Sequence, residues 1–159
     1  MRKPVWILII ITGAISLYCG FYVSTATAFP ENPATHTYFD KICEMPFVMT
    51  PGPHPETFWQ KGGDCDDRAR VFKAYLESKG ATGVQLCWMC RIENGTMVTT
   101  RTGDYSHEFV VWNNRVYNPS HNKSRQFYNV PISEYQTFAS KTHGFNTWYF
   151  ENQTVGTSF

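Results

Sequence analysis

Three side chains in this sequence could together perform nucleophilic chemistry: Cys65, His107 and Asn118. A cysteine attacks as its thiolate, and an adjacent imidazole produces that thiolate by taking up the thiol proton. A further polar group must hold the imidazole in the useful tautomer, and asparagine does this in Cys-His-Asn sites. The three residues therefore predict a catalytic site in which Cys65 is the nucleophile, His107 the base and Asn118 the residue that orients the histidine.

The sequence around Cys65 predicts a helix that begins at this cysteine. Asp64 is a suitable N-cap, and Gly80 is suited to ending the helix. One apolar stripe recurs at helical spacing: Cys65, Ala69, Phe72 and Leu76. Because Cys65 falls in the first turn, we expect the partial positive charge of the helix N-terminus to lower the pKa of its thiol.

His107 and Asn118 are expected on neighbouring strands that a tight turn at Asn113-Asn114 connects. A two-residue loop would pair Trp112 with Arg115. In that register Phe109 lies opposite Asn118. Phe109 and His107 are two residues apart on one strand, so their side chains share a face. Asn118 is then a diagonal neighbour of His107, whereas a three-residue loop would place it on the other face.

The remaining elements follow from hydrophobic periodicity and turn residues. The expected helices span residues 35–44 and 131–141, and the expected strands span residues 84–92, 96–101, 106–112, 115–118 and 146–150. Residues 45–61 contain several prolines and are expected to form a loop or an extended stretch. One central helix followed by an antiparallel meander indicates an α+β fold.

Three segments resemble motifs of the transglutaminase-like cysteine peptidase superfamily. Residues 61–69 (KGGDCDDRA) resemble its nucleophile motif, and residues 106–112 (SHEFVVW) resemble its histidine strand. Residues 116–120 (VYNPS) resemble the strand that carries the third catalytic residue, with Asn118 in the place of the usual aspartate. The motifs occur in the family's order and extend the resemblance over residues 35–125.

The resemblance implies a papain-like, transglutaminase-like core in which the central helix packs on an antiparallel sheet. It implies that Cys65 attacks an amide carbonyl to form a thioester, that His107 protonates the leaving amine, and that no metal or cofactor is needed. The Cys65 backbone N–H, Gln60 and Trp59 are the candidate oxyanion donors. Water or an amine could complete the reaction, so peptidase and transglutaminase activity both stay open. The alternative is a catalytically inactive module of the same fold that binds peptide or glycan.

Residues 1–28 are typical of a secretory signal peptide or an N-terminal membrane anchor. Arg2 and Lys3 precede an apolar run, and Ala26-Thr27-Ala28 offers the small residues of a signal peptidase site. Residues 5–23 are also long enough to span a bilayer, so both outcomes stay open. We expect residues 29–34 to be a linker and residues 35–159 to form one domain, secreted or anchored outside the cytoplasm.

The composition narrows the class of partner. Lys and Arg number 14 and Asp and Glu 13, a balance that excludes the basic footprint of a nucleic-acid binder. Aromatic residues make up 16% of the chain, and together with the export signal they favour an extracellular peptide or cell-wall polymer as substrate.

The other cysteines suggest a disulfide more than a metal site. Cys87 and Cys90 form a lone C-x-x-C pair, which is weak evidence for a metal without a second pair. Residues three apart on a strand point to opposite faces. In an oxidising compartment we therefore expect Cys43 to bond to either Cys87 or Cys90.

Overall fold

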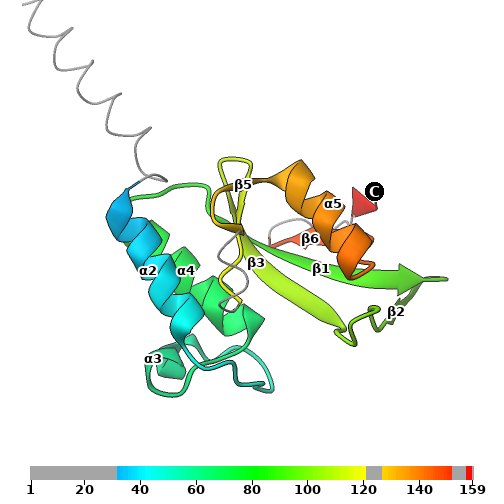
Figure 1. Ribbon diagram of the computed structural model, residues 1–159, viewed down its shortest axis with the longest axis horizontal. Coiled ribbons are helices and arrows are strands. Elements are labelled where there is room, and N and C mark those ends of the chain that lie inside the picture. The colour runs from blue at the N-terminus through cyan, green and yellow to red at the C-terminus, as the bar shows by residue number, and fades with distance from the viewer. Residues whose placement is uncertain (1–31, 121–126, 152–156, 159) are drawn as a thin grey trace, which may run out of the picture.

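The computed structural model describes residues 32–120, 127–151 and 157–158, and Figure 1 shows their arrangement. The expected signal or anchor at residues 1–28, with its apolar run at 5–23, lies outside these residues. Within the described part of the chain, no helix has both the length and the apolar character needed to cross a membrane.

The helices largely follow the predicted pattern. They are α2 (Pro33–Glu44), the 3-10 turn η1 (Pro55–Thr57), α3 (Phe58–Lys61), α4 (Cys65–Ser78) and α5 (Ile132–Thr142). Helix α2 begins inside the predicted linker because Asn32 caps it: the Ala34 N–H donates to Asn32 Oδ1 at 2.9 Å. The short helices η1 and α3 lie where a loop was expected, and Pro55 supplies the backbone angle that starts η1.

The strands form an antiparallel sheet. They are β1 (Gln85–Glu93), β2 (Thr96–Val98), β3 (Ser106–Trp112), β4 (Arg115–Tyr117), β5 (Val130–Pro131), β6 (Thr147–Phe150) and β7 (Thr157–Ser158). Their order across the sheet is β5-β4-β3-β1-β6-β7, and β2 pairs with the end of β1. The predicted α+β fold is confirmed, although β2 is shorter than expected and β4 ends one residue before Asn118.

Helices cover both faces of the sheet, as Figure 1 shows. On one face α2 and α4 pack on side chains that include Leu86 and Val110, and Phe72 lies at the centre of this core. On the other face Tyr135 of α5 packs against Phe109. The packing of α4 on the sheet was expected from the sequence. The helix layer on the other face accounts for the burial of alternate β3 side chains on both sides of the sheet.

The β3–β4 hairpin has the predicted register. Asn113 and Asn114 have φ values of 49° and 59°, which are the left-handed angles of a type I′ turn. Trp112 pairs with Arg115, and the two-residue loop is confirmed. The parity that places Asn118 on the face of His107 is therefore present.

A fully buried arginine, Arg68 of α4, connects segments that are far apart in the sequence. Its Nη1 donates to the carbonyl of Ile42 at 2.9 Å and to that of Pro119 at 3.2 Å. Nε donates to Gly63 O at 3.0 Å, and Nη2 to Met45 O at 2.6 Å. One side chain thus ties the end of α2, the turn before Cys65 and the loop after Asn118 into a single body.

We expect Arg68→Met to lower the free energy of unfolding by about 3 kcal/mol or more, because it leaves buried carbonyls without a donor. Urea denaturation followed by tryptophan fluorescence measures this loss. Arg91→Met is the control: Arg91 forms a surface ion pair with Glu93, and its loss should cost less than about 1 kcal/mol. Equal losses in the two variants would contradict the role assigned to Arg68.

Candidate active site

Cys65 is the first residue of α4 and is half-buried, as the capping pattern predicts. The turn before it requires glycine twice. A Cβ at Gly62, whose φ is +81°, would lie 2.1 Å from the Pro46 carbonyl oxygen, and one at Gly63 would lie 2.4 Å from Asp67 Oδ2. The two glycines therefore let the chain approach the start of α4 closely enough to place the cysteine at its N-terminus.

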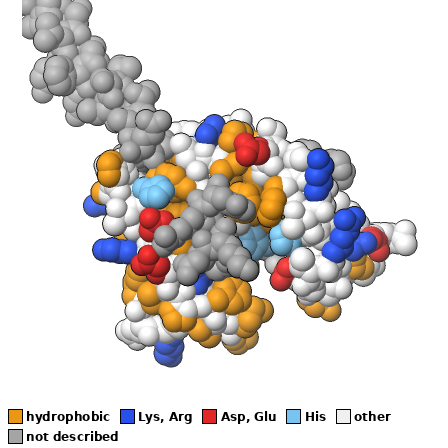
Figure 2. All heavy atoms as spheres, in the orientation of Figure 1, with side chains coloured by type: hydrophobic (Ala, Val, Ile, Leu, Met, Phe, Trp, Pro, Cys, Tyr) orange, Lys and Arg blue, Asp and Glu red, His pale blue; other side chains and the backbone are white. Residues whose placement is uncertain are grey.

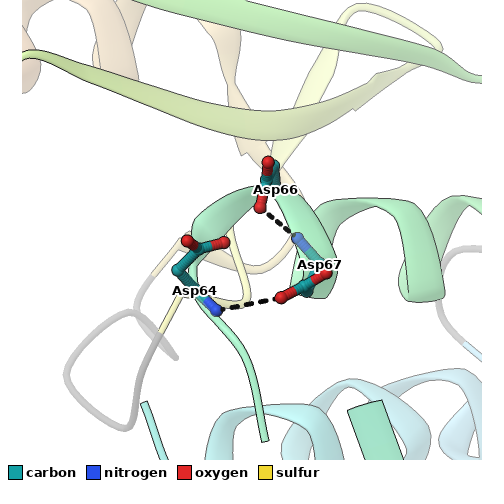
Figure 3. A group of neighbouring side chains, drawn as sticks. All are labelled: Asp64, Asp66 and Asp67. Carbon is teal, nitrogen blue, oxygen red and sulfur yellow. Dashed lines mark hydrogen bonds between the residues drawn. The ribbon is translucent and has the colours of Figure 1, made fainter. Parts of the chain in front are cut away.

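Asp64, Asp66 and Asp67 surround this helix N-terminus (Figure 3). Asp67 Oδ2 accepts from Asp64 N at 3.4 Å and from Thr50 Oγ1 at 3.2 Å, while Asp67 Oδ1 accepts from His54 N. Asp66 Oδ1 accepts from Asp67 N at 2.8 Å, and Asp64 Oδ2 from Thr50 N at 3.1 Å. The three carboxylates lie within 4.8 Å of one another, but these internal hydrogen bonds make them anchors for the preceding loop.

His107 and Asn118 meet as predicted. His107 Nε2 lies 3.0 Å from Asn118 Oδ1, and Asn118 Nδ2 donates to the hydroxyl of Tyr135 at 2.7 Å. The Tyr135 contact fixes which end of the Asn118 amide faces the histidine. Asn118 can therefore hold the neutral imidazole with its proton on Nε2.

Ser120 is a fourth member of this network that the sequence analysis did not single out. Its Oγ lies 3.0 Å from His107 Nε2 and donates to Asn118 Oδ1 at 2.6 Å. Its backbone N–H also donates to Asn118 Oδ1 at 3.3 Å, which closes a turn around Pro119. Asparagine commonly accepts from the backbone two residues on, so the Asn-Pro-Ser sequence carried a signal for this contact.

One cavity of about 820 Å³ brings these groups together. Its lining includes Cys65, His107, Asn118 and Ser120. Gln60 and Trp59, the expected oxyanion donors, are not among the described lining residues. Trp59 packs instead on Tyr38, with 5.5 Å between ring centroids, because α3 turns this stretch toward α2. The oxyanion role predicted for Gln60 and Trp59 is therefore not supported by their position.

The pKa of the Cys65 thiol is raised, contrary to the sequence-based expectation. Burial raises it to about 12, a hydrogen bond from the Glu108 backbone acts in the opposite direction, and the charges of Asp64, Asp66 and Glu108 raise it further. Desolvation and three nearby carboxylates thus outweigh the partial charge of the helix N-terminus. The resting cysteine is a protonated thiol at neutral pH.

Two carboxyl groups beside Cys65 also have raised pKa values. The pKa of Asp66 is raised to about 7, first by burial and then by the hydrogen bond and charge of Asp64. Burial likewise raises the pKa of Glu108 to about 7, although Arg70, whose Nε lies 3.5 Å from Glu108 Oε1, acts against this. Both carboxyl groups therefore change charge near neutral pH.

The expected disulfide does not form. Within the described residues, no disulfide joins Cys43 to Cys87 or Cys90. Cys43 packs in the core beneath α2 and α4, whereas Cys87 packs in the core beneath α5, so the sheet separates them. Cys90 lies three residues farther along β1, between Ser106 and Thr147 of the neighbouring strands.

Comparison of the chain with protein families, curated proteins and solved structures gave no match.

The network around His107 makes a prediction for its tautomer. We expect Asn118→Ala to abolish the preference for a proton on Nε2 and Ser120→Ala to weaken it, because each removes a partner of that nitrogen. Long-range ¹H–¹⁵N spectra of the imidazole report the tautomer. Asn118→Ala should also lower the free energy of unfolding by about 1–3 kcal/mol, because it removes the hydrogen-bond donor to the buried Tyr135 hydroxyl. An unchanged tautomer in both variants would show that these contacts do not orient the ring.

The raised pKa values of Asp66 and Glu108 predict that stability falls as pH rises from 5 to 8. The folded state holds these protons more tightly than the unfolded state, so their stabilising contribution is complete below the unfolded pKa and is lost as pH passes about 7. Urea unfolding across this range measures the slope, and Asp66→Asn combined with Glu108→Gln should flatten it. The control Glu134→Gln should leave the slope unchanged; a slope that rises with pH, or one the double variant keeps, would contradict the assignment.

Proposed function

We propose that this protein is an exported thiol enzyme that cleaves or transfers acyl groups at peptide or isopeptide amide bonds through a Cys65 thioester. The observation that carries the proposal is the 3.0 Å contact between His107 Nε2 and Asn118 Oδ1 in the cavity that Cys65 also lines. Three residues that are far apart in the sequence, and that the sequence analysis selected for their chemistry, line one cavity, which supports the proposal.

The arrangement of the elements supports a transglutaminase-like, papain-like core. The nucleophile is at the N-terminus of a helix packed on an antiparallel sheet, the histidine is on strand β3, and the orienting residue follows β4. The chain departs from that family in having asparagine at position 118. Asparagine holds the ring but adds no charge, so it does not offset the charge of the imidazolium as an aspartate would.

The reaction assigns each nitrogen of His107 a separate role. Nε2 is held by Asn118 and Ser120, so proton transfer uses Nδ1. Nδ1 takes the Cys65 proton as sulfur bonds to the amide carbonyl carbon, and it passes the proton to the leaving amine nitrogen as the C–N bond breaks. Water or a second amine then attacks the thioester, gives its proton to Nδ1, and Cys65 recovers that proton as it leaves.

The buried thiol sets the order of these events. Because its pKa of about 12 keeps Cys65 protonated at rest, deprotonation by His107 accompanies attack and does not precede it. The oxyanion of the tetrahedral intermediate can accept a hydrogen bond from the Cys65 backbone N–H, one of the N–H groups in the first turn of α4 that have no carbonyl partner within the helix.

Two observations favour a second function, a catalytically inactive module that binds peptide or glycan. The raised pKa of Cys65 and the asparagine at position 118 are both features that a binding module tolerates more easily than an enzyme does. On this alternative the cavity is a binding site, and the aromatic side chains that line it supply the contacts. Either function fits an extracellular peptide or cell-wall polymer.

Alkylation by iodoacetamide distinguishes the two functions. If His107 is the base, His107→Ala should slow alkylation of Cys65 at pH 8 by about tenfold or more, since general-base catalysis contributes roughly 10²–10⁴. Mass spectrometry identifies the labelled cysteine. The matched control is His143→Ala, since His143 lines the same cavity but bonds to Thr102, and it should change the rate less than about twofold.

Equal rates for wild type and His107→Ala would contradict the enzyme proposal. The binding-module alternative would then be supported if wild type and Cys65→Ala bound cell-wall peptide with the same affinity.

A further inference from the structure

Three consecutive apolar residues beside Cys65 are exposed: Phe47 by 50%, Val48 by 38% and Met49 by 77%. Phe47 and Met49 line the cavity that contains Cys65 and His107, whereas Val48, between them, does not. We call the side chains of Phe47 and Met49 the apolar wall. Figure 2 shows hydrophobic side chains gathered at the lower part of the molecule, where the segment between α2 and α4 runs in Figure 1.

The segment that carries the apolar wall is held firmly in place. Val48 N donates to Gly63 O at 3.3 Å and Gly63 N donates to Pro46 O at 3.2 Å, so Gly63 bonds to the residues on either side of Phe47, as between parallel strands. The Arg68 guanidinium lies 5.7 Å from the centre of the Phe47 ring. Because Gly63 and Arg68 hold this segment in place, its exposed apolar surface is preorganised for contact with another molecule.

The backbone of the same segment has one edge that makes no hydrogen bond within the described part of the chain. In an extended chain alternate residues direct their N–H and C=O groups to opposite sides, and Val48 directs its N–H toward Gly63. The backbone groups of Phe47 and Met49 make no hydrogen bond to another described residue. An extended peptide can pair with such an edge while its apolar side chain packs on the wall.

The charges of the cavity limit the ligand further. The charged side chains among the described lining residues, histidines aside, are Asp64, Asp66, Asp104 and Glu108. The lining also includes the aromatic side chains of Phe127, Phe138 and Phe145. The carboxylates repel an anionic ligand, whereas an apolar side chain can pack on the apolar part of the lining.

We propose that the apolar wall binds an apolar side chain of an extended polypeptide substrate, next to the amide bond that Cys65 attacks. The proposal rests on the proposed function, because it takes the cavity of Cys65 as the substrate site. The occupant is a peptide because the wall combines apolar side chains with a backbone edge that no described residue pairs with, a combination that neither a glycan nor a lipid requires.

The test compares iodoacetyl probes that alkylate Cys65 and carry different groups. Rates are measured for iodoacetamide, iodoacetyl-Phe-amide, iodoacetyl-Glu-amide and iodoacetyl-dodecylamine, each divided by its rate with glutathione. We expect the Phe probe to react about tenfold faster than the Glu probe, since filling an apolar pocket contributes roughly 10–200-fold. Phe47→Ser and Met49→Ser should each remove most of that preference. The control Val48→Ser changes a residue outside the cavity lining and should keep both the preference and the iodoacetamide rate within about twofold.

The outcomes separate this proposal from the proposed function. If iodoacetamide reacts in a His107-dependent manner but the Phe probe shows no preference, the wall proposal alone is wrong. If alkylation is independent of His107, the proposed function is wrong. A wall-dependent preference for the dodecyl probe over the Phe probe would identify an acyl chain as the occupant, and a dimer that Phe47→Ser dissociates in sedimentation would identify a second copy; either result overturns the peptide assignment.

Discussion

The guanidinium of Arg68 is the constraint on which the site depends. A buried cation is costly unless its donors are satisfied, and Arg68 meets this requirement with four carbonyls from three separate segments. One of these carbonyls belongs to Gly63, just before Cys65, and another to Pro119, just after Asn118. The charge is therefore accommodated only when the nucleophile's turn and the orienting residue's loop are both in place. Since carbonyl ends of α2 also face this cation, the α2 helix dipole favours the same arrangement.

In the site, the hydrogen bonds that orient His107 favour reaction, whereas the charges around Cys65 disfavour loss of its proton. Asn118 and Ser120 contact Nε2 of His107, and Tyr135 holds Asn118, all at distances typical of ordinary hydrogen bonds. Around the sulfur, burial and carboxylates hold the proton on Cys65. One of these carboxylates, Asp64, also accepts a hydrogen bond from Thr50 in the loop that carries Phe47 and Met49, so a charge that holds the proton on the thiol also anchors the wall of the cavity. A substrate that displaces water from the cavity and is attacked in concert with proton transfer is compatible with this balance.

Much of the fold could be predicted because the signals were local. The capping residue Asp64, the apolar stripe of α4 and the Asn113-Asn114 turn each depend on neighbours in the sequence, and the turn fixed the register that pairs Trp112 with Arg115. What could not be predicted depends on contacts between distant segments. From the sequence alone Arg68 resembles an ordinary surface charge, because the carbonyls it binds are 26 and 51 residues away. The pKa of Cys65 depends on its burial, which the sequence pattern does not indicate. The oxyanion role predicted for Gln60 and Trp59 also depends on tertiary structure, because residues 58–61 form α3 where a loop was expected.

The most direct test of a reactive cysteine is the capture of its acyl intermediate. The protein is mixed with p-nitrophenyl acetate, and intact and peptide mass spectrometry then locate any acetyl group. The account predicts a burst of p-nitrophenol and a hydroxylamine-labile acetyl group on Cys65, both lost in Cys65→Ala and strongly reduced in His107→Ala. Acetylation spread over surface lysines, or equal acetylation of Cys65 with and without the imidazole, would contradict it.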